Sequence, residues 1–257
     1  MHDPAAGRWQ TIGKVSVFAL KPVRKALSMI GIVLGLFVVT SYSHLILLAS
    51  LPWSDMRLLD QRIYVDPDLG EPRSRQLRDA WQAARARIER RFGLDPASPV
   101  LVVTMHQATA RRYGLGGHSG IAFALPWRHY IVVRWREDFV DLLAHELMHA
   151  QVRDLVGYPR YLLDMPTWLD EGLAMQVDDR ADYAVGPGGT GGDEIARVRQ
   201  LVNPGQFWSD DGERNLDNYR AVKAVVAELL HQHAGSVSAL LAAELDAAKA
   251  RPGPAAD

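Results

Sequence analysis

The chain has 257 residues, of which 23% are charged and 8% aromatic, and its formal net charge is −1. This length allows one sizeable core or two small domains. The near-zero charge argues against a nucleic-acid-binding protein, which would carry a basic surface. The absence of cysteine excludes disulfides, thiolate metal sites and cysteine nucleophiles.

The N-terminal region predicts a membrane anchor. Residues 26–51 contain no Asp, Glu, Lys or Arg, and a run of this length can cross the hydrocarbon layer as a helix. Basic residues precede the run and Trp53 follows it. We therefore expect a cytoplasmic tail over 1–25 and a transmembrane anchor over 26–52, in a single-pass protein of a bacterial inner membrane. The remaining chain would then be periplasmic or otherwise extracytoplasmic. A cleaved signal peptide is the alternative, although no clear small-residue cleavage site follows.

The chain after the anchor predicts one domain over 53–250. Continuous β-branched runs predict strands, and apolar residues at every third or fourth position predict helices. By these patterns we expect strands over 62–65, 99–105, 121–124 and 129–134, and helices over 72–92 and 108–113. A β-hairpin is expected where Leu125-Pro126-Trp127 separates the last two strands.

The next expected helix begins near residue 137 and carries the sequence HELMH over residues 145–149. Histidines four positions apart lie on one helix face, so the imidazoles of His145 and His149 can bind one metal ion. Glu146 flanks this pair and can reach a water molecule bound to the metal. Zinc accepts imidazole and carboxylate ligands, and its catalytic sites keep a position open for water. A coincidental pair on an amphipathic helix is the alternative, since such short motifs also arise by chance.

A second expected helix begins at Thr167 and has the sequence TWLDEGLA. Thr167 is a suitable N-cap, and Asp170 three residues later can complete a capping box. Glu171 then has a fixed orientation on the first turn, as a third metal ligand requires. Gly172 would let this helix approach its neighbour closely.

HELMH followed by WLDEGLA resembles the gluzincin clan of peptidase MA-like zinc metallopeptidases, in which HExxH precedes a glutamate ligand on a second helix. The resemblance covers residues 137–178 and extends more loosely to about residue 245. It implies His145, His149 and Glu171 as zinc ligands and Glu146 as the general base. Taken with the expected strands, it implies an α+β fold: a small mixed sheet packed on a mainly helical zincin-like catalytic domain. The segment by which the related aminopeptidases capture a substrate amino terminus has no counterpart before HELMH.

The remaining chain predicts helices over 194–202, 216–233 and 237–249 and a disordered tail over 251–257. Tyr219, near the start of its helix, resembles the downstream tyrosine that stabilises an oxyanion in related enzymes. An ordinary half-buried aromatic is the alternative for this residue. His118 and Arg220 are the other candidates for the same role.

Two further expectations concern the surroundings of the metal. Asp178 lies seven residues after Glu171, on the same expected helix face, and its carboxylate could orient His149 by accepting a hydrogen bond from its free ring N–H. The strand over 130–134 is expected, by the resemblance, to be an exposed edge that pairs with an extended peptide.

These features predict a zinc-dependent hydrolase that cleaves peptide bonds outside the cytoplasm. The ion would lower the pKa of its water and polarise the scissile carbonyl, while Glu146 takes the proton and passes it to the leaving amine. The expected partners are a peptide or protein substrate and the membrane. The alternative is a catalytically silent, membrane-tethered zinc module that acts through partner binding, although a purely structural site has no use for Glu146. An intramembrane protease is disfavoured because HELMH lies far beyond the hydrophobic run.

Overall fold

The computed structural model describes residues 29, 42–137, 139–185 and 191–250. The chain divides into two compact units, Met1–Ile46 and Leu47–Asp257. The predicted tails over 1–25 and 251–257 lie outside the described residues. All five strands and the helices from α3 onward belong to the second unit, which is the one discussed below.

The predicted transmembrane anchor is contradicted. No helix in the described part of the chain is long and apolar enough to cross a membrane. The end of the predicted anchor forms the seven-residue helix α2 (Ser43–Ala49), followed by the 3-10 turn η1 (Leu51–Trp53). Residues 26–28 and 30–41 of the anchor lie outside the described residues. On this finding the single-pass inner-membrane location is wrong.

The second unit contains a five-stranded mixed sheet with strand order β1-β2-β3-β5-β4. The central strand β3 is buried along its whole length and pairs in parallel with β2 and β5, whereas the two outer pairs are antiparallel. A continuous β-branched run suits a strand that is covered on both faces. The strands are β1 (Arg57–Asp60), β2 (Ile63–Val65), β3 (Val100–Thr104), β4 (Gly120–Leu125) and β5 (Arg128–Arg134).

The position of β5 corrects the predicted edge strand. The predicted hairpin forms, but β5 lies between β3 and β4, so its residues 130–134 are not at the edge of the sheet. Each β5 residue from Tyr130 to Val133 is buried. The hairpin places β4 on the outer side of β5, and β4 is therefore the edge strand beside the motif helix.

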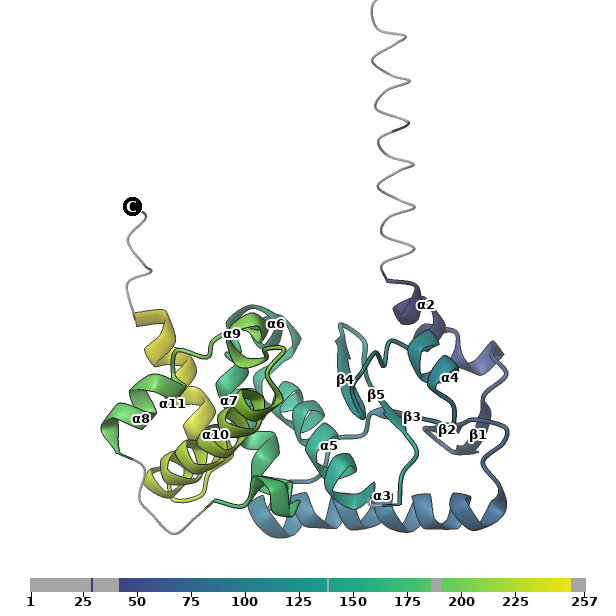
Figure 1. Cartoon of the computed structure of the whole chain (residues 1–257), viewed down its shortest axis with the longest axis horizontal. Helices are drawn as coiled ribbons and strands as arrows, with labels where there is room; N and C mark the ends of the chain where they lie inside the picture. Colours follow the sequence, from purple (N-terminus) through teal and green to yellow (C-terminus); the bar gives the residue numbers. More distant parts are fainter. Residues whose placement is uncertain (1–28, 30–41, 138, 186–190, 251–257) are drawn as a thin grey trace, which may run out of the picture. The chain divides into compact units, whose positions relative to one another are not determined.

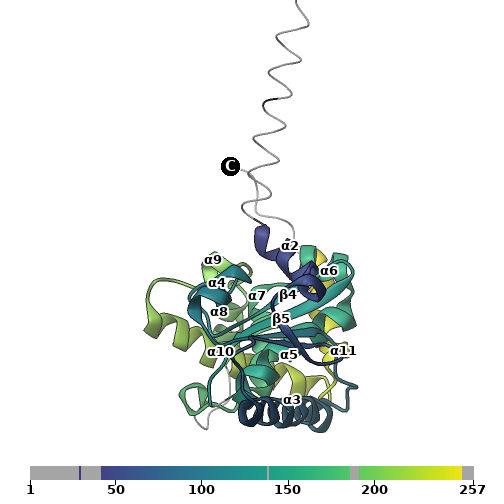
Figure 2. The ribbon, with the colours of Figure 1, turned by 90° about the vertical axis from the view of Figure 1, so that its right-hand side faces the viewer.

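Long helices cover one face of the sheet. Helices α3 (Glu71–Phe92) and α5 (Phe139–Val156) pack against each other on this face, and α4 (Gln107–Arg112) lies on the opposite face (Figures 1 and 2). The predicted apolar face of α3 is buried. The residue that follows the helix, Gly93, has a φ of +66°. Glycine adopts this left-handed conformation without the steric cost of a Cβ atom.

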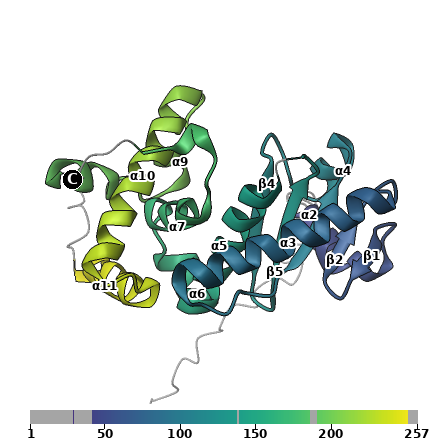
Figure 3. The ribbon, with the colours of Figure 1, turned by 90° about the horizontal axis from the view of Figure 1, so that it is seen from below.

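The rest of the second unit is helical. It comprises α6 (Tyr158–Asp164), α7 (Thr167–Ala174), α8 (Gly192–Val198), α9 (Pro204–Phe207), α10 (Gly212–Gln232) and α11 (Val237–Ala250), with the 3-10 turns η2 (Met175–Val177) and η3 (Ala181–Tyr183). Figure 3 shows α7, α10 and α11 grouped on the side of α5 that lies away from β1 and β2. The predicted α+β class, with a small sheet and a mainly helical remainder, is confirmed. The transmembrane helix that formed part of the same prediction is not.

Helix α7 is fixed against α10 by a close approach at Gly172. A Cβ atom at this position would lie 2.4 Å from Cγ2 of Val226 and 3.0 Å from the backbone oxygen of Val222. Only glycine leaves room for that contact. The predicted close helix approach at Gly172 is therefore confirmed, and it sets the position of the residue that precedes it, Glu171.

Candidate metal centre

Helix α5 places two histidines side by side in the interior. His145 and His149 are 6% and 8% exposed, and their Nε2 atoms lie 3.3 Å apart. The apolar residues on the other side of the helix, Leu143 and Leu147, are fully buried. This packing keeps α5 from rotating and so fixes the direction of both imidazoles.

Glu171 on α7 completes a group of three possible ligands. Its Oε2 lies 3.4 Å from Nε2 of His145, and its Oε1 lies 3.6 Å from Nε2 of His149. The ligand atoms of the three residues all lie within 4.8 Å of one another. The predicted gathering of two histidines and one glutamate is confirmed, and the group can hold a metal ion.

The chemistry of this group fits a metal. Two imidazoles and a carboxylate form a donor set that zinc accepts. Oε2 of Glu171 is buried and has no hydrogen-bond partner among the described residues. A buried carboxylate oxygen without a hydrogen bond costs free energy, which a cation bound between the three side chains would offset.

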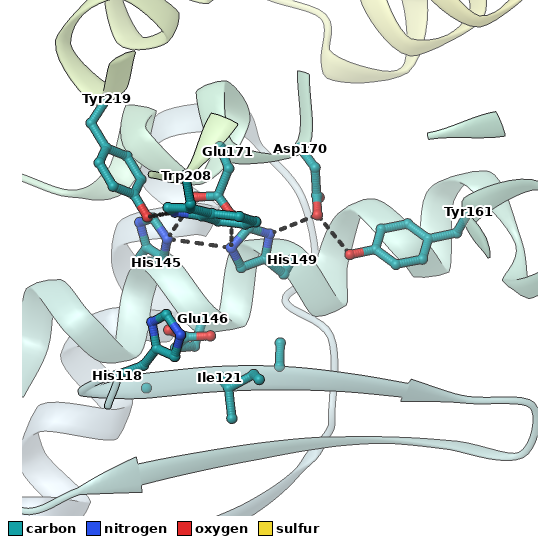
Figure 4. A pocket seen from close by; sticks show the side chains of 12 residues that line it. His118, Ile121, His145, Glu146, His149, Tyr161, Asp170, Glu171, Trp208 and Tyr219 are labelled. Atoms are coloured by element: carbon teal, nitrogen blue, oxygen red, sulfur yellow. Dashed lines mark hydrogen bonds and ion pairs between the residues drawn. The ribbon is translucent and has the colours of Figure 1, made fainter. Parts of the chain in front are cut away.

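Each histidine has a carboxylate beside its other ring nitrogen. Nδ1 of His145 lies 3.4 Å from Oδ2 of Asp178, and Nδ1 of His149 lies 3.0 Å from Oδ2 of Asp170. Figure 4 shows the contact between His149 and Asp170. Carboxylates in this position set the orientation of metal-binding imidazoles, so that Nε2 faces the metal.

The partner of Asp178 differs from the expected one. We expected Asp178 to orient His149 from a continuous second helix, but α7 ends at Ala174 and turn η2 follows. Asp178 has an extended backbone, with φ −100° and ψ 106°, and this change of direction brings its side chain to His145.

Asp170 also has a different role from the expected one. The N-cap residue of α7 is Pro166 rather than Thr167, and no side chain caps the helix. Asp170 instead accepts a hydrogen bond of 2.7 Å from the hydroxyl of Tyr161 on α6, while its carboxylate also contacts His149 (Figure 4). Tyr161 could not be recognised from the sequence, because α6 is short and has no buried residues that would mark its periodicity.

Asp178 is itself held by positive groups. Nε of Arg180 donates to its two carboxylate oxygens at 2.9 and 3.0 Å, and Nζ of Lys223 contacts its backbone oxygen. Burial opposes the charge of Asp178, but Arg180 and His145 outweigh it and hold its pKa well below the usual range. Asp178 is therefore an anion at neutral pH, as a partner of a metal-binding imidazole requires.

The same carboxylates favour protons on the histidines. Burial disfavours the charged imidazole, yet contacts with Asp178 and Glu171 raise the pKa of His145 to about 9. The charges of Asp170 and Glu171 likewise overcome burial and raise the pKa of His149 to about 10. A metal ion that binds here must displace these protons, because only the neutral imidazole is a ligand.

A cavity of about 290 Å³ lies beside the three ligand residues, with walls from β4, α5, α6, α7, α10 and the segment after α9 (Figure 4). Glu146 borders it, and burial raises the pKa of this carboxyl group. A Cβ atom on Gly120 would lie 2.6 Å from Oε1 of Glu146. The edge strand β4 therefore passes directly against the Glu146 carboxylate.

The three candidates for stabilising an oxyanion lie in different places. Tyr219 and His118 line the cavity, and the ring centroid of Tyr219 is 6.4 Å from that of His145. Burial raises the pKa of Tyr219 well above its usual value, so its hydroxyl keeps its proton. Arg220 instead donates from Nε to the backbone oxygen of Asp182 at 2.9 Å and is not among the residues that line the cavity.

Comparisons with models of protein families, with curated proteins and with solved structures find no match.

Proposed function

We propose that this protein is a zinc-dependent peptidase in which His145, His149 and Glu171 bind the metal. The observation that carries the proposal is the position of Glu146. This carboxylate is not one of the three gathered ligands, yet it borders the cavity and follows His145 directly. A structural zinc site has all its positions filled by protein ligands and has no use for an extra acid beside them.

The metal and the side chains would have separate tasks. A zinc ion in such a site lowers the pKa of water and polarises a carbonyl group. Glu146 would accept a proton from the attacking water and return it to the amine as the carbon–nitrogen bond breaks. The hydroxyl of Tyr219 would donate to the oxygen on which negative charge develops.

Strand β4 offers a place for the substrate backbone. The backbone N–H of Arg134 donates to the oxygen of Ser119 at 3.0 Å, which makes these two residues a hydrogen-bonded pair. Such pairs alternate along an antiparallel ladder. Gly120 and Ala122 therefore direct their N–H and C=O groups away from β5, and both residues line the cavity. An extended peptide could add to this edge as a further strand and would pass close to Glu146.

The test compares zinc content and peptide hydrolysis for the full chain and two variants. Glu146→Gln should bind as much zinc as the wild type and lose hydrolysis of a mixed peptide library by about 10²- to 10⁴-fold, the usual contribution of a general base. Glu89→Gln makes the same chemical change on the exposed side of α3 and should leave the rate unchanged. Bound zinc without any Glu146-dependent cleavage would instead favour a catalytically silent zinc module.

A further inference from the structure

Trp208 and Tyr219 form a hydrogen-bonded pair in the wall of the cavity. Nε1 of Trp208 lies 3.0 Å from the hydroxyl oxygen of Tyr219, and both side chains line the cavity beside the metal ligands (Figure 4). Trp208 follows the short helix α9, whereas Tyr219 is on α10. The pair therefore joins two separate segments at the site.

The segment that carries Trp208 is attached firmly to α10. Phe207 is fully buried, and its ring centroid lies 5.1 Å from that of Tyr219. Nδ2 of Asn218 donates to the backbone oxygen of Phe207 at 2.7 Å, and the backbone N–H of Ser209 donates to Asn215 at 2.8 Å. These contacts on both sides of Trp208 fix the indole relative to the phenol.

The chemistry of the two groups gives their hydrogen bond one direction. An indole N–H can only donate, so the oxygen of Tyr219 is the acceptor. The single hydrogen of the phenol cannot point towards Trp208. Among the described residues Tyr219 has no other side-chain hydrogen bond that would take this hydrogen. It is free for an acceptor in the cavity.

We propose that Trp208 is a positioning residue for the reaction at this site. By donating to the oxygen of Tyr219, its indole N–H keeps the phenol hydrogen available for a negatively charged oxygen next to the metal. A donor that already points at the developing charge needs no reorganisation during the reaction. This inference rests on the proposed function and extends it to a residue that neither binds the metal nor transfers a proton.

Three variants test whether Trp208 acts through its hydrogen bond to Tyr219 or only lines the cavity. Trp208→Phe removes the N–H and keeps an aromatic ring, whereas Tyr219→Phe removes the hydroxyl and keeps its ring. The double variant lacks both polar groups. Trp53→Phe is the matched control, because this indole is 85% exposed and does not line the cavity. Zinc affinity is measured for every variant. It should not change, because neither Trp208 nor Tyr219 is a proposed metal ligand.

The first readout is the dissociation constant of acetohydroxamate, a small zinc ligand with an anionic oxygen, for the zinc-loaded full chain. Trp208→Phe and Tyr219→Phe should each weaken binding by about three- to tenfold, the range of one hydrogen bond. The double variant should be no weaker than Tyr219→Phe alone, because Trp208 acts only through Tyr219. Trp53→Phe should bind as the wild type does.

The second readout is peptide hydrolysis by the wild type and the same four variants. Trp208→Phe should lower kcat and leave KM unchanged, because the donor acts on charge that develops in the transition state. The inference is overturned if Trp208→Phe leaves acetohydroxamate binding unchanged, or if its effect persists in the Tyr219→Phe background. If acetohydroxamate binding changes as expected but no protein hydrolyses peptides, the proposed peptidase activity is contradicted. The role of Trp208 in positioning the Tyr219 hydrogen would still be supported. Failure to bind zinc would overturn both.

Discussion

Oδ2 of Asp178 lies 3.4 Å from Nδ1 of His145, whereas the other ring nitrogen of His145, Nε2, faces Glu171. Asp178 is completely buried, and its charge is balanced by Arg180. This carboxylate therefore determines which nitrogen of His145 carries a proton and which one is free to bind a metal. The same arrangement recurs at His149, where Asp170 occupies the corresponding position.

The contact predicts that Asp178→Asn weakens zinc binding. An amide has no charge to stabilise the Nδ1 proton, and loss of such a partner reduces metal affinity by about 10- to 100-fold. The affinity can be measured by competition with a chromophoric chelator. Asp182→Asn is the matched control, because Asp182 is exposed and its side chain contacts none of the ligands. Equal affinities of Asp178→Asn and the wild type would show that the carboxylate does not support His145.

The two histidines of the candidate metal centre could be predicted from sequence because their arrangement depends on local geometry. The spacing of His145 and His149 places them on one helix face whatever the rest of the fold does. Glu171 was expected as the third ligand because of the resemblance to gluzincins, and the helix that carries it begins at the expected residue, Thr167. Both helices could be recognised without knowing how the strands are paired.

The partners of the ligands depend on contacts between distant segments and could not be predicted in the same way. Asp178 was assigned to the wrong histidine because the end of α7 at Ala174 is set by packing rather than by a glycine or proline in the sequence. The order of β4 and β5 likewise depends on which hairpin strand pairs with β3. Tyr161 and Trp208 reach the cavity from short helical segments that carry little periodic signal.

The raised pKa values of the two histidines predict that zinc binding releases protons. At pH 7 both His145, with a pKa of about 9, and His149, with a pKa of about 10, carry an extra proton in the metal-free protein. A ligating imidazole must be neutral, so zinc binding should release about two protons, and affinity should rise with pH until these values are passed. Titration calorimetry in buffers of different ionisation enthalpy measures the release. A binding enthalpy that is independent of the buffer would contradict this prediction.

The contact between Gly120 and Glu146 predicts a variant that binds metal but reacts slowly. A Cβ atom at Gly120 would lie 2.6 Å from Oε1 of Glu146 and 2.9 Å from Cδ1 of Leu142, so Gly120→Ala must displace the carboxylate. A shift of about 1 Å in a catalytic group can reduce the rate by about 10²-fold. Zinc affinity should be unchanged, because the methyl group meets none of the three ligands.

The control for that variant is Gly116→Ala in the loop before β4, because its added methyl group would have no atom within 4 Å. It should keep both zinc affinity and the hydrolysis rate. If Gly120→Ala hydrolyses peptides as fast as Gly116→Ala, the position of Glu146 next to β4 is not important for the reaction, and its assignment as the base is weakened.

The close approach of α7 and α10 predicts that Gly172→Ala destabilises the protein and weakens zinc binding together. The new methyl group would lie 2.4 Å from Cγ2 of Val226 and 3.0 Å from the backbone oxygen of Val222, and the second neighbour cannot change rotamer. Overpacking of this kind costs about 1–3 kcal/mol, against a gain of about 1 kcal/mol from the higher helix propensity of alanine. Any net movement of α7 shifts Glu171, so zinc affinity should fall as well.

Urea unfolding of the metal-free protein measures the change in stability, and chelator competition measures the change in zinc affinity. Gly192→Ala is the control, because its added methyl group would have no atom within 4 Å. A Gly172→Ala protein with unchanged stability and unchanged zinc affinity would mean that α7 can move away from α10 without moving the metal ligand.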